Sequence, residues 1–294
     1  MIRSRWEAAV AVVLGVVIGC GAPDAGAVPI GKVPDGSVAP QGANDWSCAP
    51  ATGHPEPVVL IHGTWDNQNA WDVLAPRVKA AGYCVFSLNY GRDTSSALGG
   101  IPGQYATADI RVSAREVAAF VDRVRAATGA GKVALVGHSQ GAVVARQYVR
   151  FAGGADKVGH LISLAGTNHG VSVGGLLSTR VETPQSPEWQ AVPVTGVAFV
   201  QQLSGSALLR ELNDGGDTVA GIAYTAIGSR FDDTSTPLEA TFLQAGPGAD
   251  VDNVIVQDVC ASDSYPHAML PQSPAVAYII ERALDPTFEG TPCA

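Results

Sequence analysis

The sequence predicts an α/β fold, with a mostly parallel central sheet and helices on both of its faces. Short runs of consecutive apolar residues alternate with segments in which apolar residues recur every three or four positions. The runs are typical of strands buried on both faces, and they lie at 57–61, 83–88, 132–136, 161–164, 222–227 and 251–256. Regular alternation of strands and helices is typical of parallel sheets with crossover helices. The chain has 294 residues, of which 46% are apolar, and this is enough for one domain with a large core.

Four helices are expected between and after these strands. The helical pattern at 71–81 is followed by Gly82, and the pattern at 140–152 is followed by Gly153. Each glycine is expected to end its helix, because glycine is favoured just after a helix C-terminus. A third helix ends at Gly129, and a last one is expected at 274–283. The helix before Gly129 carries one buried stripe, formed by Ile110, Ala114, Val117, Val121 and Val124.

Three segments lack such patterns. Residues 21–56 and 92–106 are expected to form an entry segment and a loop. Residues 170–215 contain Pro184, Pro187 and Pro193 between short apolar pieces. We interpret 170–215 as an insertion over the sheet that forms a lid or a wall of a binding site, with an irregular surface excursion as the alternative.

The N-terminus predicts an export signal. Arg3 and Arg5 precede an unbroken apolar run at 8–18, which is too short to span a bilayer comfortably. The sequence Ala25-Gly26-Ala27 fits an ordinary signal peptidase, so that 1–27 is the signal peptide.

A second processing route competes with the first. Val17-Ile18-Gly19-Cys20 resembles a lipobox, in which case 1–19 is removed and Cys20 carries a lipid. Both routes predict a secreted or envelope-attached protein. Residues 28–47 are then a linker, and 48–294 form the folded domain.

The cysteines agree with export. Apart from Cys20 there are four, and an even number in an exported chain indicates two disulfides. Three pairings are possible. We favour Cys48–Cys84 and Cys260–Cys293, because each closes a moderate loop within one half of the chain. Four buried free thiols are the alternative.

The sequence Gly137-His138-Ser139-Gln140-Gly141 carries the chemistry. It matches the G-x-S-x-G nucleophile elbow of the α/β-hydrolase fold, and it lies between a predicted strand and a predicted helix. The tight reversal places the serine in a strained backbone conformation, and Gly137 and Gly141 relieve the crowding around it. The sequence therefore predicts Ser139 as a nucleophile.

A serine nucleophile needs a base, and in this fold the chain order is Ser, then Asp or Glu, then His. His267 lies in a loop between the last strand and the last helix, so it is the expected base. His169 is the weaker alternative, and we expect it to be a hydrogen-bonded loop residue. His160, before a strand, is expected at the surface.

The acid is expected after the strand 222–227, where Asp232 and Asp233 follow a short turn. Asp232 is our choice, with Asp233 as its solvated neighbour. Asp258 and Asp263 are nearer to His267 in sequence, but nearness in a loop does not make them its partners.

An oxyanion hole is expected from two backbone N–H groups. Gln140 follows the nucleophile, and Thr64 lies in His62-Gly63-Thr64-Trp65, directly after the first strand. We interpret His62 as a structural residue that packs this loop. No dinucleotide or Walker motif is found, and the histidines lack zinc-ligand spacing, so no cofactor or metal is expected.

Several segments resemble the bacterial secreted lipases of the class 2 triacylglycerol lipase family. The resemblance runs from about residue 45 to the C-terminus and is weakest at 170–215. The segments that carry it are Pro57-Val58-Val59-Leu60-Ile61-His62-Gly63-Thr64, Gly82-Tyr83-Cys84-Val85-Phe86, Gly137-His138-Ser139-Gln140-Gly141 and Asn168-His169-Gly170.

The resemblance also bears on the acid and the base. Phe231-Asp232-Asp233 before Thr236-Pro237 is similar to the family's Tyr-Asp-Glu before Thr-Pro, and Pro266-His267 is similar to its Glu-His near the C-terminus. The chain departs from the family pattern at Ala142, where many relatives have glycine, and at Asp233, where they have glutamate. Neither change removes a catalytic group.

The resemblance implies hydrolysis of carboxylic esters with lipid acyl chains, through an acyl-enzyme. An envelope acyltransferase on the same scaffold and a catalytically silent lipid-binding surface protein are the alternatives. Expected partners are a lipid or ester substrate and a lipid interface, and the chain is expected to be a monomer. The net charge of −9 without a basic block argues against nucleic acid as a partner.

Overall fold

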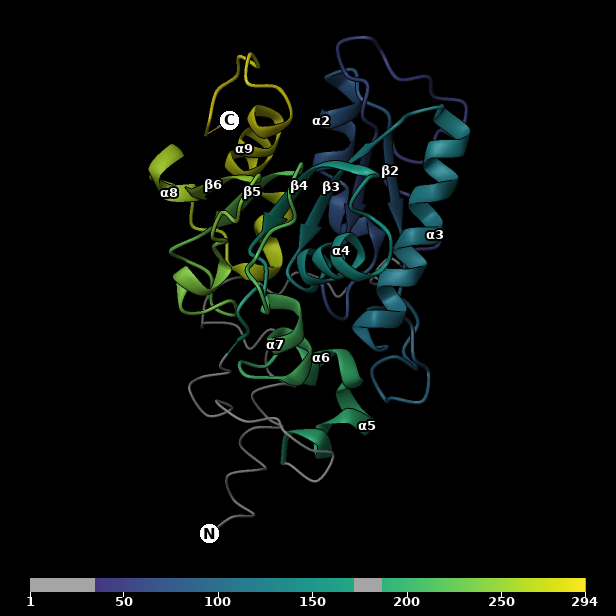
Figure 1. Ribbon diagram of the computed structural model, residues 1–294, viewed down its shortest axis with the longest axis vertical. Coiled ribbons are helices and arrows are strands. Elements are labelled where there is room, and N and C mark those ends of the chain that lie inside the picture. The colour runs from purple at the N-terminus through teal and green to yellow at the C-terminus, as the bar shows by residue number, and fades with distance from the viewer. Residues whose placement is uncertain (1–34, 172–186, 294) are drawn as a thin grey trace, which may run out of the picture.

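The computed structural model describes residues 35–171 and 187–293, and Figure 1 shows a central sheet with helices packed on both faces. All six strands are parallel, in the order β2-β1-β3-β4-β5-β6. Their bounds are β1 Val58–Ile61, β2 Val85–Leu88, β3 Val133–His138, β4 Val158–Leu164, β5 Ala223–Gly228 and β6 Asp250–Ile255. The predicted fold class is confirmed.

Helices of different length connect these strands. The α-helices are α2 Leu74–Ala80, α3 Ile110–Thr128, α4 Gln140–Phe151, α5 Val192–Thr195, α6 Val197–Gln201, α7 Ala207–Asn213, α8 Val256–Val259 and α9 Pro274–Leu284. Four short 3-10 helices are described as well: η1 Gln68–Trp71, η3 Pro187–Ala191, η4 Leu238–Thr241 and η5 His267–Gln272.

The sheet separates two hydrophobic clusters, because neighbouring side chains of a strand point to opposite faces. In β1, Val59 and Ile61 belong to the cluster that α3, α4 and α7 cover. Val58 and Leu60 belong to the cluster that α2 and α9 cover. All four side chains are fully buried, which explains why the strand is a continuous apolar run.

Helix α3 forms as the sequence predicts. Its five expected core residues are fully buried on the same side of the sheet as α4. The side chain of Asp109 accepts a hydrogen bond from the N–H of Arg111 and caps the first turn. Gly129 ends the helix in the left-handed conformation, with φ of 72°.

The expected insertion at 170–215 lies partly outside the described residues, because 172–186 are not among them. Its described part contains η3, α5, α6 and α7, and Figure 1 shows α5–α7 (green) together at one end of the molecule. Leu208, Leu209 and Leu212 of α7 join the main core next to α3 and α4. This helix is therefore part of a core layer.

Strand β4 begins at Val158, three residues before the expected start. His160 consequently lies inside the strand, half-buried, with its Nε2 2.9 Å from Thr225 Oγ1 of β5. The expected surface position of His160 is wrong. Gly159 and His160 interrupt the apolar run, so the sequence pattern does not indicate the first three residues of the strand.

Two disulfides close the ends of the domain, and both have the favoured pairing: Cys48–Cys84 and Cys260–Cys293. The first ties the entry segment to the start of β2, and the second ties the C-terminal segment to the end of α8. Both are consistent with an extracellular protein. The predicted signal peptide and Cys20 lie outside the described residues. Within the described ranges, no helix is long and apolar enough to cross a membrane.

The Cys48–Cys84 bridge is expected to stabilise the fold by restricting the unfolded chain. It joins residues 36 apart, so Cys48→Ala with Cys84→Ala should lower the free energy of unfolding by about 3–4 kcal/mol. Urea denaturation under non-reducing conditions measures this loss. Cys260→Ala with Cys293→Ala, which opens a bridge of separation 33, is the matched comparison. Unchanged stability in both double variants would show that the bridges do not form.

Candidate active site

Ser139 occupies the turn between β3 and α4. It has φ of 54° and ψ of −121°, in the left-handed half of backbone space that residues other than glycine rarely enter. Its backbone N–H donates to the carbonyl oxygen of Leu164 at the end of β4, at 2.9 Å. Strain of this kind persists where the surrounding structure imposes it, and it gathers at functional sites.

The two elbow glycines are required for different reasons. A Cβ on Gly137 would lie 2.5 Å from the backbone nitrogen of Ala142, inside the turn itself. A Cβ on Gly141 would lie 2.2 Å from the carbonyl oxygen of Ile61, in the neighbouring strand β1. Gly137 therefore permits the tight reversal, and Gly141 permits close packing of α4 on the sheet.

Gly141→Ala is accordingly expected to lower the free energy of unfolding by about 1–3 kcal/mol, because either β1 or α4 must move to make room for the Cβ. Gly131→Ala is the matched control. A Cβ there has no atom within 4 Å, so its effect should stay within about 0.5 kcal/mol. Thermal unfolding of both variants tests the contrast, and equal melting temperatures would contradict the close packing at Gly141.

Asp232 and His267 lie in contact. Asp232 follows β5, and His267 begins η5. Nδ1 of His267 lies 2.8 Å from Oδ2 of Asp232 and 3.0 Å from Oδ1. Because the carboxylate only accepts, Nδ1 carries the proton and Nε2 is the free basic nitrogen. This is the tautomer that a general base toward a serine hydroxyl requires.

The carboxylate of Asp232 is held ionised. Burial is the largest single influence and raises its pKa, but the hydrogen bond and charge of His267, together with hydrogen bonds from two backbone N–H groups, outweigh burial and lower it. The backbone N–H groups of Thr234 and Ser235 add hydrogen bonds of 2.8 and 2.7 Å to Oδ1. The pKa of Asp232 is therefore below its ordinary value, although the residue is buried.

The other acidic residues are engaged elsewhere. Asp233 is exposed, and its side chain accepts a 3.3 Å hydrogen bond from the backbone N–H of His267 and a 3.4 Å hydrogen bond from the adjacent Thr234 hydroxyl. Asp258 pairs with Arg230 at 2.7 Å, and Asp263 accepts a hydrogen bond from Ser273. Among the acidic residues weighed, the structure brings only the side chain of Asp232 to the ring of His267.

The elbow and the His267 loop touch through His138, which precedes Ser139. The His138 and His267 ring centroids are 4.8 Å apart, and Nε2 of His138 donates to the carbonyl oxygen of His267 at 3.1 Å. No hydrogen bond joins Ser139 Oγ to His267 in the described part of the chain. The structure therefore places Ser139 next to the loop that carries His267, and His138 makes the direct contact.

His138 is a site residue that sequence reasoning missed. Burial lowers its pKa to about 3, so the ring is neutral. A Cβ on Gly63 would lie 3.1 Å from His138 Nδ1 and 3.2 Å from Ser139 Cβ. Gly63 is thus the residue that allows the loop after β1 to approach the elbow. The x of G-x-S-x-G is unrestricted, so the motif gives no signal for this histidine.

The two expected oxyanion-hole residues are neighbours. Gln140 is the first residue of α4, and its side-chain Nε2 donates to Thr64 Oγ1 at 2.9 Å. The backbone N–H groups of Thr64 and Gln140 have no hydrogen-bond partner among the described residues. Both are therefore free to donate to a substrate oxygen.

His62 packs the loop after β1, as expected. It is buried and stacks on Tyr90 at a centroid distance of 4.5 Å. Its Nδ1 lies 2.8 Å from the carbonyl oxygen of Gly63, and burial lowers its pKa to about 4. A neutral, buried ring of this kind is structural.

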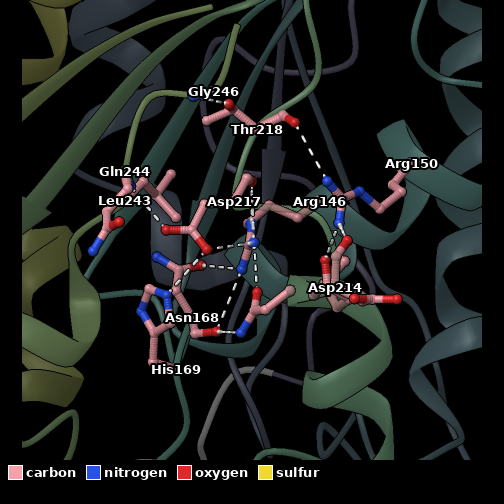
Figure 2. Close-up of polar contacts among 12 residues, drawn as sticks. Arg146, Arg150, Asn168, His169, Asp214, Asp217, Thr218, Leu243, Gln244 and Gly246 are labelled. Atoms are coloured by element: carbon pink, nitrogen blue, oxygen red, sulfur yellow. Dashed lines mark hydrogen bonds and ion pairs between the residues drawn. The ribbon is translucent and has the colours of Figure 1, made fainter.

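His169 belongs to a separate polar network, drawn in Figure 2. Its Nε2 lies 3.1 Å from Asp217 Oδ1, and its Nδ1 lies 3.1 Å from the carbonyl oxygen of Ala240. Arg146 of α4 is buried beside them and donates to the carbonyl oxygen of Asp217 at 3.0 Å and to Asn213 Oδ1 at 2.7 Å. The expected loop role of His169 agrees with this geometry.

Both ring nitrogens of His169 face acceptors, so the charged imidazolium fits best. The hydrogen bond to Asp217 is the main reason that the pKa of His169 is raised. A raised pKa stabilises the fold below the ordinary histidine value of about 6.5, and this stabilisation is lost as the pH rises through the folded-state value. The charged groups that face the ring are Asp217 and Arg146.

His169→Ala should therefore cost more stability at acidic pH than at alkaline pH. Urea denaturation of the wild type and the variant at two pH values measures the difference. His160→Ala should show the opposite trend, because burial lowers the pKa of His160 to about 4 and its neutral form is the one that the fold favours. A loss at His169 that is independent of pH would contradict the imidazolium.

In the described ranges, no cluster of three or more His, Cys, Asp or Glu side chains could hold a metal ion. The arrangement is that of an α/β hydrolase: a parallel sheet, a serine at a strained strand-to-helix turn and a histidine bonded to an acid. Such a site performs acyl transfer through a serine when the base is within reach of the hydroxyl.

Comparison with known proteins supports this class. The family model described as Lipase (class 2) matches residues 55–244, and the chain belongs to this family. The matched segment contains Ser139 and Asp232, whereas His267 lies beyond it. No curated protein is similar enough in sequence to match.

Solved structures show the same fold. Aspergillus fumigatus lipase B is similar with a TM-score of 0.61 and 18% identity, over 87% of this chain and 56% of that one. The present chain thus spans little more than half of that lipase. An esterase from Exiguobacterium antarcticum is similar with a TM-score of 0.53 and 14% identity, over 80% of this chain and 93% of that one. At these identities the two solved structures show a shared fold.

Proposed function

We propose that this protein is a serine hydrolase that cleaves carboxylic esters with lipid acyl chains. Ser139 is the nucleophile, His267 the base, and Asp232 the acid that orients it. The observation that carries the proposal is the 2.8 Å contact between Asp232 and His267 beside a strained serine.

The geometry supports the following steps. Nε2 of His267 takes the proton of Ser139 Oγ as the oxygen attacks the ester carbonyl carbon. The backbone N–H groups of Thr64 and Gln140 stabilise the negative charge on the carbonyl oxygen. The imidazolium then protonates the leaving alcohol. Water repeats the sequence on the acyl-enzyme and releases the carboxylic acid.

Apolar side chains next to the acid and the base favour a lipid substrate. Phe231 precedes Asp232 and is 52% exposed, and Met269 lies two residues after His267 and is 46% exposed. In this proposal the two side chains form part of the surface that meets an apolar acyl chain or interface. The disulfides and the N-terminal pattern support action outside the cell, with or without a lipid on Cys20.

A panel of p-nitrophenyl esters tests the proposal. We expect kcat/KM to rise from acetate through butyrate to octanoate, with Ser139→Ala as the control for uncatalysed hydrolysis. Turnover of the acetate alone would restrict the protein to an esterase of small substrates. No turnover of any ester, together with no reaction with a fluorophosphonate, would refute the hydrolase and leave a silent binding protein. Ester products formed with an added alcohol would show an acyltransferase.

A further inference from the structure

Four segments that are distant in sequence meet at the hydroxyl of Thr64. Thr64 lies in the loop after β1, Gln140 begins α4, Thr167 follows β4, and Gln202 is the residue after α6. Nε2 of Gln140 and Nε2 of Gln202 each lie 2.9 Å from Thr64 Oγ1. The side chain of Gln202 also accepts a 3.0 Å hydrogen bond from Thr167 Oγ1.

Backbone carbonyls fix the orientation of both amides. Nε2 of Gln202 lies 3.0 Å from the carbonyl oxygen of Ala198, and Nε2 of Gln140 lies 3.0 Å from that of Ala106. A carbonyl oxygen only accepts, so the NH₂ end of each amide must face it. Both glutamines therefore donate to Thr64 Oγ1, and the Thr64 hydroxyl in turn donates to Gln202 Oε1 at 3.4 Å. Reversing either amide would lose its second hydrogen bond to a backbone carbonyl.

The two glutamines differ in what else they do. Gln140 is part of the elbow, and its position follows from α4. Gln202 is 138 residues away from Thr64 along the chain, and its own position follows from α6, the C-terminus of which it caps. It is buried together with Thr167, so water does not compete for the hydrogen bond between these two side chains, whereas Thr64 is half-buried.

We propose that Gln202 is a positioning residue for the oxyanion hole. It holds the Thr64 side chain against Gln140, and thereby fixes the direction of the Thr64 backbone N–H. The proposal rests on the proposed function of Thr64. It matters for catalysis because an oxyanion donor acts fully only when it is held in place before charge develops.

The expected effect is specific to the transition state. Loss of a complete oxyanion donor costs about 10²–10³ in kcat, and a donor that remains but is less well held should cost less, on the order of tenfold. Binding of the uncharged ester depends little on this N–H, so KM should change by less than about twofold.

Gln202→Leu tests the proposal, with Gln201→Leu as the matched control. The neighbouring Gln201 is also buried and makes hydrogen bonds of 2.8 and 2.7 Å, but to Ile110 N and Asp109 Oδ2 at the start of α3. Each variant removes the hydrogen bonds of one buried glutamine side chain at the C-terminal end of α6. Only Gln202→Leu should lower kcat for a p-nitrophenyl ester about tenfold with KM retained. Equal kcat values in the two variants would overturn the proposal.

A double-mutant cycle identifies the path through Thr64. In a Thr64→Val background Gln202→Leu should lower kcat by less than about twofold further, whereas in a Thr64→Ser background it should keep its full effect. An undiminished effect with valine would show that Gln202 does not act through the hydroxyl.

Hydrogen exchange gives a readout that does not require activity. Amides of 62–66 should exchange faster in Gln202→Leu than in the wild type, and should be unchanged in Gln201→Leu. If the wild type hydrolyses no ester, the proposed function fails, and this comparison still decides the role of Gln202. Unchanged exchange at 62–66 in Gln202→Leu would contradict it.

Discussion

Replacement of Ser139 by alanine is expected to lower kcat for ester hydrolysis by about 10⁵–10⁶-fold, while the fold is retained. The hydroxyl oxygen is the atom that forms the acyl-enzyme in the proposed mechanism, and alanine has no substitute for it. The Cβ of alanine matches that of serine at the strained turn, so the backbone at φ of 54° gains no new clash. Initial rates with a p-nitrophenyl ester measure the loss, and circular dichroism measures the fold.

Ser113→Ala is the matched control for this variant. Ser113 is also a buried serine, its hydroxyl has no hydrogen-bond partner among the described residues, and it lies in α3. It should keep its activity within a few-fold of the wild type. Activity retained in Ser139→Ala would show that Ser139 is not the nucleophile.

Replacement of Asp232 by asparagine should lower kcat by about 10⁴-fold, because the amide can donate to Nδ1 and stabilise the wrong tautomer of His267. The residue is buried and nearly isosteric with asparagine, so the packing around it should survive. The lowered pKa of Asp232 means that the carboxylate stays ionised as the pH falls to its ordinary value of about 3.9. Its contribution to stability is lost only as the pH drops further, through the folded-state pKa.

Asp233→Asn separates the two neighbouring acids. Asp233 is exposed, and its side chain contacts the backbone N–H of His267, at 3.3 Å, and the hydroxyl of the adjacent Thr234, at 3.4 Å, but not the His267 ring. We expect its kcat to stay within about threefold of the wild type, since surface substitutions of this kind have small effects. A larger loss for Asp233→Asn than for Asp232→Asn would reverse the assignment.

Elements and motifs that depend on residues close together in the chain could be predicted from the sequence. The buried stripe of α3 and the strand β1 follow from the spacing of apolar residues, and the structure places both as expected. The elbow follows from two glycines that flank a serine between a strand and a helix. Chain order, together with the loop between the last strand and the last helix, directs the choice of base to His267, although its contact with Asp232 spans 35 residues.

Features that depend on distant contacts could not be predicted. His138 lies against His267 only because the fold brings together residues 129 apart. Asp217, the partner of His169, follows it by 48 residues in a stretch without a clear pattern. Short helices such as α6 have too few residues to show a periodicity, so Gln202 could not be connected with Thr64 before the structure placed them together.

From the sequence, the preference for Asp232 over Asp233 rests only partly on physical grounds. The two are adjacent and follow the same strand, so position alone does not separate them, and a resemblance to family motifs supported Asp232. The structure supplies a physical reason: the turn after β5 directs Asp232 inward, where two backbone N–H groups and His267 bind its carboxylate, and leaves Asp233 exposed.

Labelling with a fluorophosphonate, followed by peptide mapping, tests most directly whether the side chain at the elbow is an activated nucleophile. One adduct per chain on Ser139 is expected, with a labelling rate that falls sharply in Asp232→Asn and stays near that of the wild type in Asp233→Asn. An adduct on a different residue, or labelling that is equally fast without the Asp232 carboxylate, would contradict the account.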